Sequence, residues 1–189
     1  MIRRIGLVVA LTFLLVACSV TPERWAEDYR LSSMQYLQQE RNWSFEGRLA
    51  VVNEKDSISA SIVWRHMQNS DDIELVGPLG QGRVKINVSP ELVLVDDGES
   101  RKTFYGAADE VIAEQLGVAM PVNALKYWVL GVNDPEQDFA EQVGGFYQGG
   151  WLVRYREMQK VSKESLPRKM TVEKDKTRIK LIIDQWDLS

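Results

Sequence analysis

The sequence is poor in the residues that build disulfides, metal clusters and catalytic triads. Its 189 residues include one cysteine, Cys18, and one histidine, His66. A single cysteine excludes an intramolecular disulfide and a cysteine-rich metal site, and a single histidine excludes zinc motifs that need two. The chain also lacks G-x-x-x-x-G-K-[ST], G-x-S-x-G and H-E-x-x-H. We therefore expect no catalytic residues, no metal and no cofactor, and we do not expect an enzyme.

A basic excess is also missing. The chain has 23 Lys and Arg against 27 Asp and Glu, for a formal net charge of −4. This balance argues against a nucleic-acid partner, since nucleic-acid-binding domains are normally basic. With 44% hydrophobic residues, a chain of this length can fold as one domain with a sizeable core.

Long apolar runs are absent except at the start of the chain. After the basic residues Arg3 and Arg4, Ile5–Val16 carries no charge. Twelve helical residues would span about 18 Å, against about 30 Å for a hydrocarbon core, so the run is short for a membrane span. A basic start, a short apolar run and a small residue, Ala17, together indicate an export signal.

The end of this signal is more specific. Leu15-Val16-Ala17-Cys18 resembles the bacterial lipobox, whose cysteine is S-diacylated, becomes the new N-terminus and is then N-acylated. The alternative is an ordinary signal peptide with a stray cysteine. The lipobox predicts removal of residues 1–17 and a single lipid-anchored domain, 18–189, of 172 residues and net charge −6. Two or more acyl chains anchor a protein stably, and Ser19, where Asp marks inner-membrane retention, favours the outer membrane.

The rest of the chain is dominated by alternating strands. Strict alternation of apolar and polar residues is typical of half-buried strands, and it recurs from Ser44 to Val88 and again from Trp151 to Ile183. Helical spacing appears in three segments: Thr21–Arg41, Ala107–Leu116 and Val122–Leu130. So long a sheet must curl to bury its apolar face. We predict a mainly β (α+β) fold: a curved antiparallel sheet, or incomplete β-barrel, of about ten or eleven strands with helices closing an apolar cavity.

Isolated polar residues give weak signals. His66 ends a predicted strand, and we interpret it as a satisfied or exposed loop histidine and not as a catalytic base. The pairs Asp71-Asp72 and Asp96-Asp97 are interpreted as solvated turn carboxylates and not as an acid/base dyad.

The loop Gly77-Pro78-Leu79-Gly80-Gln81-Gly82 is more informative. Glycine and proline suit a turn, but a leucine at the tip does not follow from turn chemistry. Leu79 either packs back onto the end of the barrel or forms an exposed apolar tip that touches lipid or a lipidated partner.

Three stretches, in this order, resemble the LolB family, the outer-membrane lipoprotein receptors of Gram-negative bacteria. They are Glu74–Gly80, Met120–Gly131 and Ile179–Trp186, and they follow the lipobox. The likeness is loose between Asp134 and Lys169.

The resemblance implies an incomplete β-barrel with a helical lid over an apolar cavity. It implies a receptor on the periplasmic leaflet of the outer membrane that accepts acylated lipoproteins from the carrier LolA and inserts them. Pro78, Leu79 and Gly80 would form the insertion loop, and we expect a monomer. From the predicted inward faces, the acyl-chain cavity is expected to be lined by Ile58, Ile62, Trp64, Ile73, Leu75, Val84, Ile86, Trp128, Trp151, Val153 and Leu181.

Two other functions remain open from the sequence. One is a lipid-anchored module that binds a small apolar ligand or transports lipid with the same fold. The other is a structural envelope lipoprotein that only tethers or scaffolds, without a cavity.

Overall fold

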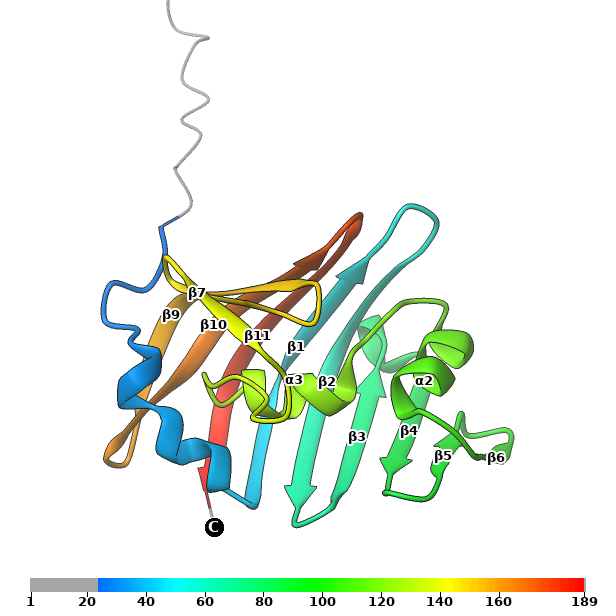
Figure 1. Ribbon diagram of the computed structural model, residues 1–189. Helices are drawn as coiled ribbons and strands as arrows, with labels where there is room; N and C mark the ends of the chain where they lie inside the picture. Colours follow the sequence, from blue (N-terminus) through cyan, green and yellow to red (C-terminus); the bar gives the residue numbers. More distant parts are fainter. Residues whose placement is uncertain (1–23, 189) are drawn as a thin grey trace, which may run out of the picture.

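Residues 24–188 are described by the computed structural model, so Cys18 and the expected signal segment lie outside the described residues. The described chain forms an 11-stranded antiparallel sheet in the order β6-β5-β4-β3-β2-β1-β11-β10-β9-β8-β7 (Figure 1). The strands are β1 (Asn42–Val52), β2 (Ser57–Met67), β3 (Ser70–Val76), β4 (Arg83–Val88), β5 (Val93–Asp96), β6 (Arg101–Phe104), β7 (Phe139–Gln142), β8 (Gly145–Gln148), β9 (Trp151–Val161), β10 (Glu164–Lys174) and β11 (Thr177–Leu188).

The sheet consists of two meanders joined through the first and last strands. Strands β1 to β6 follow one another in space, as do β7 to β11, and β1 pairs with β11. In that junction Leu49 lies opposite Leu181. The sheet curves strongly, and β6 and β7 are its two free edges (Figure 1). The predicted curved, open antiparallel sheet is confirmed.

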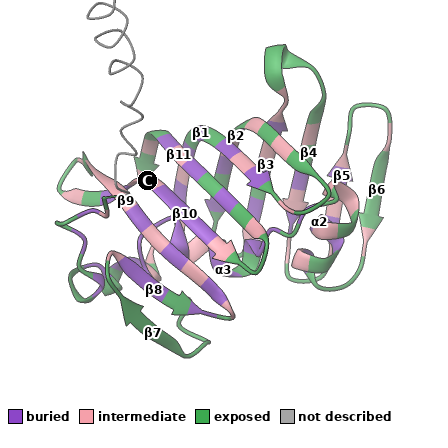
Figure 2. Ribbon diagram, turned by 90° about the horizontal axis from the view of Figure 1, so that it is seen from above, coloured by how far each residue is buried: buried purple, intermediate pink, exposed green. Residues whose placement is uncertain are grey.

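Burial follows the alternation along the strands. In β1, Phe45, Leu49 and Val51 are buried, whereas Glu46 and Arg48 between them are exposed. Figure 2 shows the same bands on the central strands. Successive side chains of a strand point to opposite faces, so every second residue of the long strands contributes to the core on the concave face.

Two helices connect the meanders and lie over the concave face: α2 (Ala108–Leu116) and α3 (Val122–Trp128) (Figure 1). Helix α2 ends at Gly117, whose φ of 73° provides the left-handed C-cap. Both helices match the predicted segments to within two residues. Among residues 24–188, no helix is both long and apolar enough to cross a bilayer.

The predicted helix over Thr21–Arg41 is wrong for its described part. The chain runs irregularly to Arg30 and then forms two short 3₁₀ helices, η2 (Leu31–Ser33) and η3 (Gln35–Gln39). Leu31, Met34 and Leu37 are buried three residues apart, which is the period of a 3₁₀ helix and not the 3.6 of an α-helix. The segment is held to the body of the protein, because the Ala26 amide donates to the Tyr155 carbonyl at 2.9 Å.

Candidate functional site

The apolar concave face is the first part of the candidate site. Nine of the eleven residues expected to line a cavity are buried, and the other two, Ile58 and Val84, are half-buried and pack against the same cluster. They come from β2, β3, β4, β9, β11 and α3. The structure thus places these residues in the apolar interior, whereas binding of acyl chains by them stays a prediction. We call the ten of them that lie on strands the concave core.

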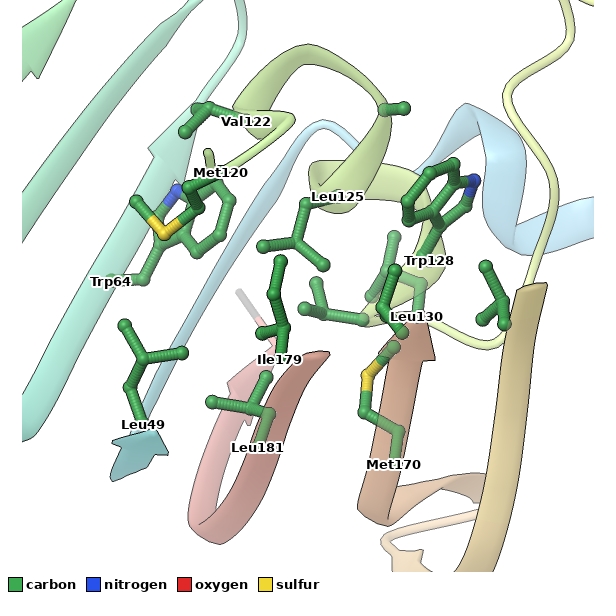
Figure 3. Packing of buried hydrophobic residues seen from close by; sticks show 14 of the residues in the cluster. Leu49, Trp64, Met120, Val122, Leu125, Trp128, Leu130, Met170, Ile179 and Leu181 are labelled. Atoms are coloured by element: carbon green, nitrogen blue, oxygen red, sulfur yellow. The ribbon is translucent and has the colours of Figure 1, made fainter. Parts of the chain in front are cut away.

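The concave core is covered and filled by the two helices and their connection, residues 108–128, which we call the lid. Figure 3 shows Met120 against Trp64, and Leu125 pointing toward Ile179. Met120 and Leu125 are each 1% exposed. In this conformation the space above the strands is occupied by the lid's own apolar side chains.

Buried hydrogen bonds fix the C-terminal end of the lid to the sheet. Trp128 Nε1 donates to Gln148 Oε1 at 2.9 Å, and Gln148 Nε2 donates to the Asp134 carbonyl at 2.9 Å. The Tyr155 hydroxyl donates to the Trp128 carbonyl at 2.8 Å. Burial raises the pKa of Tyr155 well above its usual value, so this phenol remains a donor. The sequence analysis did not identify Gln148, because a single glutamine between turn glycines carries no signal.

The other end of the lid is linked mainly within itself. Asp109, in the first turn of α2, accepts a hydrogen bond from the Asn123 amide of α3 at 3.1 Å. Burial raises the pKa of the Asp109 carboxyl, and the hydrogen bonds from the Asn123 and Val122 amides oppose that shift only in part. This bond joins the two helices to each other. An exposed hydrogen bond from Asn53 Nδ2 to the Gly117 carbonyl, at 3.2 Å, links the end of α2 to the β1–β2 connection, whereas the buried bonds of Gln148 and Tyr155 join the end of α3 to the sheet. The lid is thus tied to the strands most firmly at its C-terminal end.

A polar cluster lies at the end of β2 and the start of β3. Trp64 Nε1 donates to Asp71 Oδ1 at 2.8 Å, and His66 Nδ1 lies 2.8 Å from the same oxygen. His66 also stacks on Trp43, with ring centroids 5.2 Å apart. The interpretation of His66 as a satisfied histidine is confirmed.

The interpretation of Asp71 as a solvated turn carboxylate is wrong. The hairpin turn is so tight that β3 already begins at Ser70, and this places Asp71 on the inward face and Asp72 on the outward face. Asp71 is buried and Asp72 is exposed. Asp96 ends β5 and Asp97 lies in the following turn, where it accepts the Ser100 amide, so that predicted turn is confirmed.

The Gly77–Gly82 loop is the second part of the candidate site. Its backbone closes on itself, with the Gly77 amide donating to the Gly82 carbonyl at 3.0 Å. Pro78–Gly80 forms a short 3₁₀ turn, η4, in which Leu79 has a φ of 60° and a 97% exposed side chain. A Cβ on Gly77 would lie 2.3 Å from the Gln81 carbonyl oxygen, so only glycine fits there. The alternative in which Leu79 packs back onto the barrel is therefore wrong.

A groove of about 670 Å³ lies beside this loop. Leu79 and Pro78 form one wall, and Ala50, Ser61 and Ile182 contribute from the outward face of the strands. Open apolar space is thus found next to the exposed leucine, whereas the concave core is filled by the lid. Within residues 24–188, no group of three or more His, Cys, Asp or Glu side chains is placed to hold a metal ion.

Solved structures with this fold are distant in sequence. A LolA superfamily protein from Nitrosomonas europaea superposes with a TM-score of 0.54 and 7% identity, covering 84% of this chain and 92% of that one. A DUF1329 family protein from Desulfovibrio piger gives a TM-score of 0.52 and 8% identity, covering 84% and 90%. At these identities the likeness establishes the fold alone.

Sequence relatives are closer and cover most of the chain. The outer-membrane lipoprotein LolB of Nitrosococcus oceani is 30% identical over 159 residues, which is 80% of this chain and 79% of that protein. The LolB of Halorhodospira halophila is 28% identical and covers 97% of this chain and 94% of its own. The family model described as outer membrane lipoprotein LolB matches residues 41–186. The chain belongs to the LolB family of outer-membrane lipoproteins.

Proposed function

We propose that the protein receives acylated lipoproteins from a LolA-type periplasmic carrier and delivers them to the outer membrane, to which Cys18 anchors it. The acyl chains of the cargo bind to the concave core after the lid moves aside. The observation that carries this proposal is the extent of the concave core, which is apolar along strands from both meanders and is covered by a lid tied mainly at one end.

The energetics favour such an exchange. Each buried methylene gains about 0.8 kcal/mol, so a sixteen-carbon chain gains on the order of 10 kcal/mol on leaving water. A lid that swings away exposes Met120 and Leu125, but an incoming acyl chain covers the strand surface that they leave. The ligand thereby selects the open conformation through its higher affinity for it. Transfer from a carrier then needs only a higher affinity in the receiver and no nucleotide.

The Gly77–Gly82 loop supplies the contact with the bilayer in this proposal. Leu79 is held outward by a loop whose backbone forms three internal hydrogen bonds, from the Gly77, Gly80 and Gln81 amides. Burying a leucine side chain stabilises a protein by about 1.5–3 kcal/mol relative to leaving the side chain in water. Leu79 gains a similar free energy when it moves from water into the apolar part of a bilayer. Leu79 is proposed to enter the headgroup region while the cargo leaves.

A transfer assay tests the proposal. Purified carrier loaded with a lipoprotein is mixed with outer-membrane vesicles and with the wild-type protein, Leu79→Glu, or the control Tyr105→Glu, whose side chain is also largely exposed. We expect Leu79→Glu to keep the melting temperature of the wild type but to deliver little lipoprotein to the vesicles. Tyr105→Glu should deliver lipoprotein normally. Normal delivery by Leu79→Glu would contradict the role of the loop. Free phospholipid in an extract of the purified protein, with no transfer from the carrier, would favour a lipid-binding lipoprotein instead.

A further inference from the structure

The described chain begins close to the expected anchor. Arg24 is six residues after Cys18, and an extended chain covers at most about 3.6 Å per residue. The Cα atom of Arg24 therefore stays within about 22 Å of the anchored residue, whatever path the chain takes. When Cys18 carries its lipid anchor, the surface around Arg24 therefore lies near the bilayer.

That surface is the turn between β7 and β8, because Trp25 is packed against it. A Cβ on Gly144 would lie 2.5 Å from the Trp25 Cβ, so the Trp25 side chain packs directly on the Gly144 backbone. The guanidinium groups of Arg154 and Arg156 lie 4.6 Å and 5.4 Å from the Trp25 ring centroid. Figure 1 shows the turn beside the start of the described chain. Trp25 thus holds the start of the described chain at one corner of the sheet.

The chemistry of this corner suits a lipid–water interface. Val143, at the tip of the turn, is 80% exposed, and Tyr147 on β8 is also exposed. Tryptophan, tyrosine and arginine together with an apolar tip are the residues that sit at headgroup depth. The nearby acidic side chains, Glu27, Asp28 and Glu141, are exposed and can remain in water.

We propose that the β7–β8 turn and the stack of Trp25 with Arg154 and Arg156 form a second membrane-contacting surface, whose partner is the phospholipid bilayer itself. Val143 enters the headgroup region, and the stack of Trp25 with Arg154 lies beside it at headgroup depth. The surface fixes the orientation of the anchored protein on the membrane. It rests on the lipid anchor and on this corner of the fold, and it does not depend on what the concave core binds.

Depth-dependent fluorescence tests this surface in the lipidated protein. Cys18 is the only native cysteine and is acylated, so Val143→Cys carries a single environment-sensitive fluorophore. The matched control is Met67→Cys, because Met67 is also well exposed, at 58%, but lies at the far end of β2 (Figure 1). Each protein is reconstituted into phosphatidylethanolamine vesicles, with and without phosphatidylglycerol, that contain a lipid-bound quencher.

We expect the probe at position 143 to shift to the blue and to be quenched, and the probe at position 67 to behave as in water. A second variant combines Val143→Asp with the fluorophore on Tyr147→Cys. The ratio of quenched to unquenched probe should then fall about tenfold, as the loss of one buried valine side chain predicts. Equal quenching at positions 143 and 67 would overturn the proposal, as would quenching at a probe on Leu79→Cys with none at position 143. Since no cargo or carrier is present, failure here leaves the transfer assay unaffected.

Discussion

Replacing Leu125 with alanine is expected to loosen the lid selectively. Leu125 is 1% exposed, and its side chain points from α3 into the concave core (Figure 3). Large-to-small changes of this kind lower stability by about 2–5 kcal/mol. If the lid opens while the sheet stays folded, a loss of about 2 kcal/mol raises the open population about 30-fold, at tenfold for each 1.4 kcal/mol.

Native-state hydrogen exchange measures that population directly. The Leu125 amide, which donates to the Pro121 carbonyl at 2.7 Å, reports on α3 within the lid, and amides paired between β1 and β11 report on the sheet. In the wild type we expect the α3 amides to be less protected than the β1–β11 amides, because local opening precedes global unfolding. In Leu125→Ala the α3 amides should exchange about 30-fold faster.

A matched core variant separates local from global opening. Phe45 is equally buried but packs against Trp43, Trp64 and Trp186 of the sheet. Phe45→Leu should accelerate exchange in the sheet and leave α3 at its wild-type rate. If the α3 amides are as protected as the β1–β11 amides in the wild type, the lid does not open on its own and the reasoning is refuted.

Three further predictions concern stability and follow from single contacts. Gly77→Ala forces a Cβ against the Gln81 carbonyl oxygen, and this steric clash is expected to lower the melting temperature through about 1–3 kcal/mol of lost stability. An unchanged melting curve would show that the loop adapts. Asp71→Ala leaves the buried ring nitrogens of Trp64 and His66 without their acceptor and should lower the free energy of unfolding in urea by about 2–5 kcal/mol. Asp72→Ala removes the exposed neighbouring carboxylate and should change the free energy of unfolding little. Equal effects of the two variants would contradict the assigned faces. Burial raises the pKa of Asp109, so ionisation of this carboxyl lowers the stability of the folded state as the pH rises from the ordinary carboxyl pKa through the raised one. Asp109→Asn should therefore have a higher melting temperature than the wild type at pH 7 and the same melting temperature in acid. A lower melting temperature of the variant at pH 7 would contradict this reasoning.

The strand pattern and the two lid helices could be predicted because each depends on local alternation. The inward positions of β2, such as Ile62 and Trp64, follow from period two, and the end of α2 follows from Gly117. The exposed position of Leu79 was one of two alternatives, and the left-handed backbone at that residue decides between them.

The features that were missed depend on contacts between distant segments. Pairing of β1 with β11 joins residues 126 to 145 positions apart, and no local pattern encodes it. Gln148 acquires its role only because Trp128 and Asp134 are brought to it. The segment before β1 resembles a helix in spacing, but its path along the sheet imposes a 3₁₀ period.

The central claim is that acyl chains bind to the concave core. A photo-crosslinking residue at Ile62 faces that core, and one at the adjacent Val63 faces outward on the same strand; Ile86 and Lys85 form a second such pair on β4. With lipoprotein-loaded carrier added, the account predicts that positions 62 and 86 capture the acylated lipoprotein while 63 and 85 do not, and that unacylated cargo is not captured. Failure of both inward positions to capture cargo during active transfer, or equal capture at 62 and 63, would contradict it.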